Sequence, residues 1–178
     1  MFPAPSVGPE SPVWLPPIEA ACTAIGDEIF FVVDDGRLSN LLHVLDTKTM
    51  KFRVQPLRHA VESISEIVPM RVPSIIAIGT TLYLFGGQQG PSHDQPVPPN
   101  QSPAYTIDTT TWELSPLEFL RGQQPWLHNV GVAAIGSKIY TFGGTDGMYI
   151  FSSLHSLDIG NQTSDLRIIR SLRSLLTT

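Results

Sequence analysis

The sequence predicts an all-β protein of about three similar four-stranded antiparallel sheets that pack against one another. An Ile-Gly pair followed by two polar residues recurs three times, with its glycines at Gly26, Gly79 and Gly136. The spacings are 53 and 57 residues, and a short apolar stretch flanks each pair on both sides. A fixed long period of this kind indicates a repeat architecture.

Each Ile-Gly pair is expected to begin a tight hairpin between two antiparallel strands. In the second unit, "SIIAIGTTLYLFGGQQG" from residue 74, residues two apart then share a face of the sheet. Leu82 and Leu84 lie on one face, and Tyr83 and Phe85 lie on the other. Because both faces are apolar, such a sheet must be covered on both sides.

A third strand that ends in aspartate follows in every unit, within "HVLDTKT", "AYTIDTTT" and "HSLDIGN". We interpret Asp46, Asp108 and Asp158 as structural turn residues. A fourth strand follows in the first two units and contains Phe52 and Trp112. The third unit has no aromatic residue at that position, so its outer strand is expected to be missing or replaced.

Four short strands per period of about 55 residues are typical of a β-propeller blade. The sequence resembles the kelch-repeat family in the following residues: Gly86, Gly87, Gly143, Gly144, Tyr83, Tyr140 and Trp112. The resemblance implies kelch-type blades in which these residues have structural roles. The diglycines are expected to lie where packed neighbours crowd the backbone and a positive φ is needed. The first unit departs from the pattern, with Val33 and Asp34 in place of the glycines.

We divide the chain into residues 1–19, three repeats within 20–160, and a tail at 161–178. The repeats cover about 20–58, 73–118 and 129–160, and the Pro-rich first segment could be the outer strand of another blade. The tail is expected to be a short helix or a degenerate outer strand. Because propellers close with about four to eight blades, three blades make an incomplete ring. A fragment of a longer propeller is the favoured explanation, and self-association into a six-bladed ring or an open arc is the alternative.

Composition excludes several classes of function. The net charge of −5 disfavours a nucleic-acid partner, which normally requires a basic face. No apolar run approaches the roughly 18 residues of a membrane span, and the N-terminus lacks the features of a signal peptide, so a cytoplasmic protein is expected. The single cysteine, Cys22, lies in an apolar stretch and is interpreted as a small buried core residue.

Two loops are candidates for binding, since loops on a rigid scaffold commonly hold functional residues. The Pro-rich stretch 88–103 contains His93 and Asp94, and the stretch 122–129 contains Trp126 and His128. Both have structural alternatives. The first could be an insertion without function, and the second could supply a core aromatic residue beside a hydrogen-bonded histidine.

No catalytic residue, metal site or cofactor is predicted, because the histidines are far apart in sequence and no HExxH, CxxC or GxSxG motif occurs. The expected function is a non-enzymatic protein–protein interaction module with an unidentified protein partner. The alternative is a piece of a galactose-oxidase-like or carbohydrate-binding propeller, in which Trp14, Trp112 or Trp126 would stack on a sugar. The copper chemistry of such oxidases would need a cysteine-crosslinked tyrosine, and Cys22 is not expected to supply it.

Overall fold

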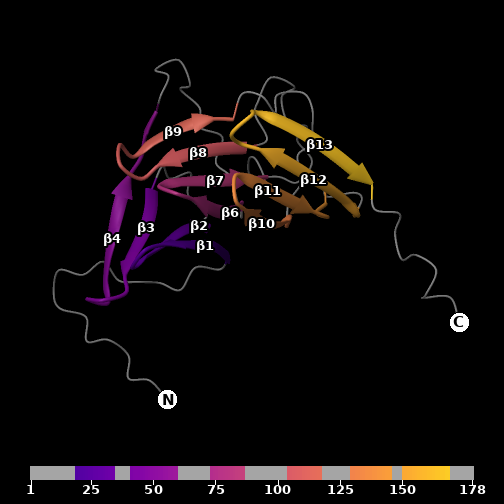
Figure 1. Ribbon diagram of the computed structural model, residues 1–178. Coiled ribbons are helices and arrows are strands. Elements are labelled where there is room, and N and C mark those ends of the chain that lie inside the picture. The colour runs from indigo at the N-terminus through magenta and orange to yellow at the C-terminus, as the bar shows by residue number, and fades with distance from the viewer. Residues whose placement is uncertain are drawn as a thin grey trace, which may run out of the picture.

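The fold consists of three β-sheets that stand side by side in chain order (Figure 1). The structure is a computed structural model that describes residues 19–34, 41–59, 73–86, 104–117, 129–145 and 150–168. All regular secondary structure in these ranges is β-strand, and the three sheets do not close into a ring. The predicted all-β class with three antiparallel units is therefore confirmed.

The first sheet contains four strands in the order β1-β2-β3-β4. These strands are β1 (Glu19–Ile25), β2 (Glu28–Asp34), β3 (Leu41–Asp46) and β4 (Lys51–Pro56). Where the other units have glycine, Val33 and Asp34 continue β2, and Asp34 still pairs with Glu19. With Val33 and Asp34 in place of the glycines, the pairing of β1 with β2 therefore continues for two more residues.

The second sheet contains the four expected strands and one short strand that the sequence did not predict. The expected strands are β6 (Ser74–Ile78), β7 (Thr81–Phe85), β8 (Ala104–Asp108) and β9 (Glu113–Pro116). The additional strand, β5 (Arg58–His59), pairs in parallel with β9 at the outer edge. Since β5 follows the last strand of the first sheet, it ties the chain leaving that sheet to its neighbour.

The third sheet also has four strands, which corrects one expectation. Its strands are β10 (Gly131–Ile135), β11 (Lys138–Phe142), β12 (Ser153–Asp158) and β13 (Thr163–Ile168). The expectation of a missing or replaced outer strand does not hold, because β13 pairs with β12 along its whole length. β13 lies within the tail 161–178, for which an outer strand was one of the two alternatives and a short helix the other. An aromatic residue is not needed for this pairing, which depends on backbone hydrogen bonds and alternating side chains.

Each sheet has tight turns at one end. The hairpin glycines have positive φ values of 57° at Gly26 and 59° at both Gly79 and Gly136. The next turn of each sheet docks on this hairpin through a backbone hydrogen bond, as from the Thr109 amide to the Thr80 carbonyl at 3.0 Å. A positive φ is easy for glycine because it has no Cβ.

The repeated aspartates act as turn acceptors, which confirms their predicted role. The Asp46 carboxylate accepts hydrogen bonds from the Lys48 and Thr49 amides at 2.8 and 2.9 Å. Asp108 and Asp158 make the equivalent bonds to the amides two and three residues on. Because these bonds favour the ionised carboxylate, the pKa of Asp46 is lowered, mainly by the Thr49 amide.

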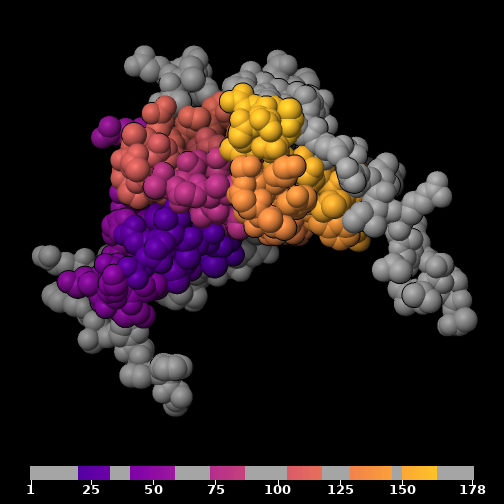
Figure 2. Space-filling model, in the orientation of Figure 1, coloured from indigo at the N-terminus to yellow at the C-terminus, as the bar shows by residue number. Residues whose placement is uncertain are grey.

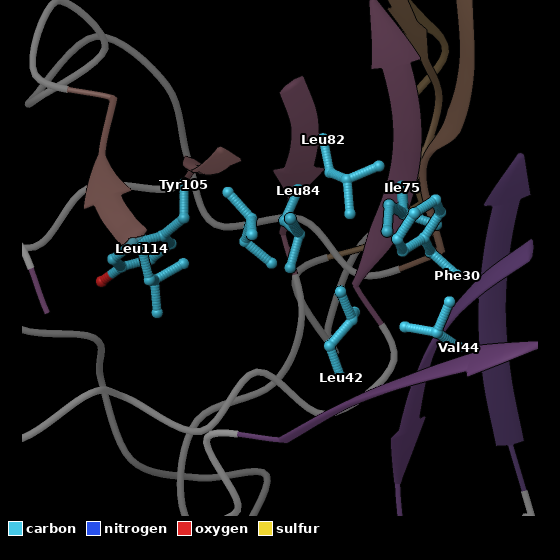
Figure 3. Close-up of a cluster of buried hydrophobic side chains, with 9 residues drawn as sticks. Phe30, Leu42, Val44, Ile75, Leu82, Leu84, Tyr105 and Leu114 are labelled. Atoms are coloured by element: carbon cyan, nitrogen blue, oxygen red, sulfur yellow. The ribbon is translucent and has the colours of Figure 1, made fainter. Parts of the chain in front are cut away.

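Two apolar clusters fill the gaps between the sheets. The cluster between the first and second sheets is shown in Figure 3 and contains Phe30, Leu42, Val44, Ile75, Leu82, Leu84, Tyr105, Ile107 and Leu114. The cluster between the second and third sheets contains Tyr83, Phe85, Ala104, Ile139 and Leu157. The middle sheet is therefore covered on both faces, as its two apolar faces predicted, and the three sheets form a continuous stack (Figure 2).

Cys22 is exposed, so its predicted place in the core was wrong. Its partner across the hairpin is Phe31, whereas the buried residue of β2 is Phe30. Cys22 and Phe31 therefore lie on the face of the first sheet that is turned away from the second. An apolar run in a strand does not by itself say which face is covered.

Candidate interaction surfaces

The diglycine positions lie at the ends of the second strands. Gly86 has a φ of 66°, and Gly143 and Gly144 have φ values of 72° and 99°. A Cβ added to Gly143 would lie 3.4 Å from the carbonyl oxygen of Phe151. The positive φ favours glycine there, because other residues rarely adopt this backbone conformation, whereas the added Cβ would only reach van der Waals contact with Phe151. Gly87 lies outside the described residues.

The chain that returns to β12 contains a β-bulge opposite the diglycine. Phe142 pairs with Leu154, but Thr145 pairs with Ile150, so the returning chain has one more residue over this stretch. The Gly143 amide donates to the Ser153 carbonyl at 3.0 Å. A bulge bends and twists a strand, which turns this end of the third sheet out of the regular ladder.

The aromatic residues of the kelch pattern differ in their surroundings. Tyr83 is buried between the second and third sheets, and burial raises the pKa of its hydroxyl. Tyr140, the equivalent residue of the third sheet, is only half-buried. This difference follows from position, since the third sheet has a neighbouring sheet on one face and the second sheet has one on both.

Trp112 is half-buried at the boundary between the first and second sheets. Its ring centroid lies 6.5 Å from that of Phe30, and the Arg53 guanidinium lies 5.8 Å from the Trp112 ring centroid. Arg53 also pairs with Glu28, and this hydrogen bond raises the pKa of the guanidinium. Trp112 thus contacts residues of the neighbouring sheet. Trp14 and Trp126 lie outside the described residues.

The four predicted binding residues, His93, Asp94, Trp126 and His128, also lie outside the described residues. The described ends of their two loops, however, meet in one place. Phe85 pairs with Ala104, so residues 87–103 leave and re-enter the second sheet at the same end. The Leu117 amide donates to the Ala104 carbonyl at 2.9 Å, so the next connection starts beside the same residue.

That second connection also ends nearby, because the Ser74 hydroxyl donates to the carbonyl of Val130. Ser74 in turn pairs with Phe85 in the hairpin of β6 and β7. We call the shared anchor of both loops the loop base, formed by Ser74, Phe85, Ala104, Leu117 and Val130. It lies at the end of the second sheet opposite the tight turns.

A different kind of surface lies on the outer face of the first sheet. The first end face is formed by Cys22, Phe31, Leu41, Phe52 and Val54, which the strand register places on one side. Leu41, Phe52 and Val54 are 39%, 45% and 39% exposed, and the rings of Phe31 and Phe52 lie 6.1 Å apart. The register also places the half-buried His43 on this face, between Phe31 and Val54. Among the described strand residues of the face there is no Asp, Glu, Lys or Arg.

The outer face of the third sheet is the counterpart. The apolar part of the second end face is formed by Ala133, Ile135, Tyr140, Phe142 and Leu154, again on one side by register. The register places Lys138 and Asp158 on the same side, near the tight turns, and their side chains form an ion pair at 3.9 Å. Ile135 is 70% exposed and Phe142 is 48% exposed. Apolar side chains of this size are normally buried in strands with such a pattern, so the two ends of the stack each present apolar surface to solvent.

One polar pair inside the stack was not singled out from the sequence. His155 is 5% exposed, and its Nε2 lies 3.1 Å from the Ser153 hydroxyl oxygen. Burial lowers the pKa of this histidine, because the charged ring loses water. The strand period could have indicated it, since His155 shares a face with the buried Leu157. Within the described ranges, no three His, Cys, Asp or Glu side chains gather closely enough to hold a metal ion.

Comparison with known proteins decides the family. The sequence matches the KLHDC2/KLHL20/DRC7 Kelch-repeats domain over residues 19–171. The chain belongs to the kelch-repeat family. The matched residues of this kelch chain include every strand from β1 to β13, so the sheets described above are kelch blades.

This kelch chain is also similar to a curated plant protein. The protein is named N-(sulfonatooxy)prop-2-enimidothioate sulfolyase, from Thlaspi arvense, and is 32% identical over 92 residues. The alignment covers 51% of this chain but only 25% of the relative, so the chain spans about a quarter of that protein's length.

No helix among the described residues has the length and apolar character to cross a membrane.

Proposed function

We propose that this chain is a non-enzymatic protein–protein interaction module that holds its partner with the loops of the loop base. Membership of the kelch-repeat family supports a propeller-type scaffold. The observation on which the proposal depends is the common anchor of the two loops at Ala104, which accepts the Leu117 amide and pairs with Phe85. Two connections that start from one point can act as a single surface.

The scaffold below the loop base is suited to hold such loops in place. Ala104 and Phe85 are both buried and belong to the cluster between the second and third sheets. Loops fixed at both ends to a packed core lose less conformational entropy when they bind. The stretches contain His93, Asp94, Trp126 and His128, and aromatic side chains with nearby polar groups are common at the centre of protein interfaces.

The test is a comparison of co-purified proteins between matched variants of the whole chain. The loop variants are the double changes His93→Ala with Asp94→Ala, and Trp126→Ala with His128→Ala. The control is Lys48→Ala, because Lys48 lies in a tight turn and its side chain is 72% exposed. We expect a partner that is retained by the wild type and by the control and lost with a loop variant. Identical partner sets for all four proteins would contradict the proposal.

A piece of a galactose-oxidase-like or carbohydrate-binding propeller is the second candidate. It is supported by the enzyme name of the Thlaspi arvense relative, although the shared region is only a quarter of that protein. Of the three tryptophans in this chain, Trp112 packs against Phe30 and Arg53, and this packing reduces the area of its ring that a sugar could contact. Tight stoichiometric binding of copper in calorimetry, or binding to a defined glycan that is lost on Trp126→Ala, would favour this second function.

A further inference from the structure

Each end face is built from residues equivalent to those that are buried where two sheets of this chain pack together. On the second sheet, Tyr83 and Phe85 point toward the third sheet and are 7% and 5% exposed. The residues 57 positions later, Tyr140 and Phe142, lie on the corresponding face of the third sheet. Phe142 is 48% exposed. The second end face is thus equivalent to a face that is covered inside the stack, but none of the described sheets covers it.

The first end face corresponds to the opposite side of the same contacts. On the second sheet, Ile75 and Leu84 point toward the first sheet and are both 5% exposed. The residues 53 positions earlier are Cys22 and Phe31, and both belong to the first end face. Among its described strand positions the face contains no Asp, Glu, Lys or Arg, and its one histidine is His43. Covering the face while the His43 ring is neutral therefore buries no uncompensated charge.

We propose that the second end face of one copy of this chain packs on the first end face of another, and that two copies close a six-bladed ring. The contact repeats the way in which the second sheet already packs on the third. Because the two faces differ, such a contact either closes a ring or extends without limit. Propellers close with about four to eight blades, and two copies of three sheets fall within that range.

The internal contacts also indicate which inner residues meet between copies. Strand β6 lies between β1 and β10, and Ile76 of β6 packs in the same cluster as Val132 of β10. By the 57-residue and 53-residue spacings, the equivalent residues at the new contact are Ala133 of one copy and Cys22 of the other. This pairing can be probed because Cys22 is the single cysteine of the chain.

The first experiment measures the mass of the full chain by light scattering and sedimentation at micromolar concentration. We expect twice the chain mass of 19.5 kDa for the wild type. Phe142→Ser changes the second end face, and Phe52→Ser changes the first. Because a ring of two copies has two contacts and each contact uses both faces, either substitution is present at both contacts. A tenfold weakening of each contact therefore raises the dissociation constant about a hundredfold, and both variants are expected to be monomers.

Met50→Asn is the matched control, because Met50 is 68% exposed, lies in a turn outside both end faces, and has a positive φ that asparagine tolerates. It should remain a dimer. Far-ultraviolet circular dichroism confirms that each variant is folded. A monomeric wild type, open-ended polymers, or a Phe142→Ser variant that still forms a dimer would each overturn the proposal.

The second experiment tests the geometry with cysteine crosslinking. Ala133→Cys is treated with a short bismaleimide and compared with Met50→Cys, and mass spectrometry identifies the joined peptides. We expect a crosslinked dimer in which Cys22 of one copy is linked to the introduced cysteine of the other, at least tenfold more than for Met50→Cys. Equal crosslinking of the two variants would overturn the assigned contact. Neither experiment alters the loop base, so failure here leaves the proposed function standing.

Discussion

Replacement of Ile139 by alanine tests whether packing between blades holds the fold together. Ile139 is 0% exposed and lies in the cluster between the second and third sheets. The change removes about three methylene groups, worth about 2.4 kcal/mol at roughly 0.8 kcal/mol each. The cavity adds to this loss, so we expect the free energy of unfolding to fall by about 3 kcal/mol, within the range of about 2–5 for such changes.

For a chain of this length, that loss corresponds to a decrease in Tm of roughly 6–12 °C. Ile150→Ala is the matched control, since Ile150 is 86% exposed and the chemical change is the same. Its effect should stay within about 0.5 kcal/mol. Urea unfolding followed by circular dichroism measures both. Equal midpoints for the two variants would refute the claim that contacts between the sheets stabilise the fold.

Three further predictions concern single side chains and are measured as Tm by differential scanning fluorimetry. Asp108→Ala should lower Tm more than Asp108→Asn at pH 7, because only alanine loses the acceptor for the Thr110 amide. Since the folded-state pKa of Asp108 is lowered, chiefly by its hydrogen bonds with Thr110, the advantage of the wild type over Asp108→Asn should be present at neutral pH. It should disappear as the pH falls through that pKa, and an unchanged difference in acid would contradict this. The pKa of His155 is also lowered, by burial, so the wild type should lose stability as the pH falls below about 6.5, and His155→Gln should lose less; parallel pH curves would contradict the assignment. Gly143→Ala should cost about 1–2 kcal/mol because of its φ of 72°, whereas Gly131→Ala, at a glycine without a positive φ, should have little effect; equal losses would show that φ is not the cause.

The sequence predicted the blades through signals that are local and repeated. The Ile-Gly hairpins and the turn aspartates satisfy their own backbone within a few residues, as Asp46 does with Lys48 and Thr49. Such elements need no knowledge of the rest of the fold. Alternation in β7 also showed that the middle sheet must be covered on both faces, and it is.

The elements that sequence reasoning missed depend on distant partners. Strand β5 has only two residues, and it forms because Arg58 and His59 reach the edge of β9 more than fifty positions later. Strand β13 was only one of two alternatives for residues 161–178, because Leu166 and Ile169 are three positions apart and so also fit one face of a helix. In the structure, Leu166 pairs with His155. The strand forms because the edge of β12 supplies backbone hydrogen-bond partners, and the sequence of the tail alone does not show that this edge is available.

The candidate site was only partly predictable for a similar reason. The exposure of Cys22 follows from the position of the first sheet, since none of the described sheets packs on that face, and an apolar run does not reveal this. Likewise, nothing in the spacing of the two loops shows that they share an anchor. That anchor depends on the Leu117 amide reaching the carbonyl of Ala104 across the sheet.

The outer rims of the sheets have a consequence for how copies can aggregate. An open edge strand is a template for adding strands from other molecules and so for fibril growth. Here β9 is partly occupied by β5, and it ends in Pro116, which has no amide hydrogen to donate. Charged residues recur along the rim strands β4 and β13, at Lys51 and Arg53 and at Asp165 and Arg167. Lateral strand addition is therefore discouraged, and concentrated solutions should resist thioflavin-positive fibre formation for as long as the blades stay folded.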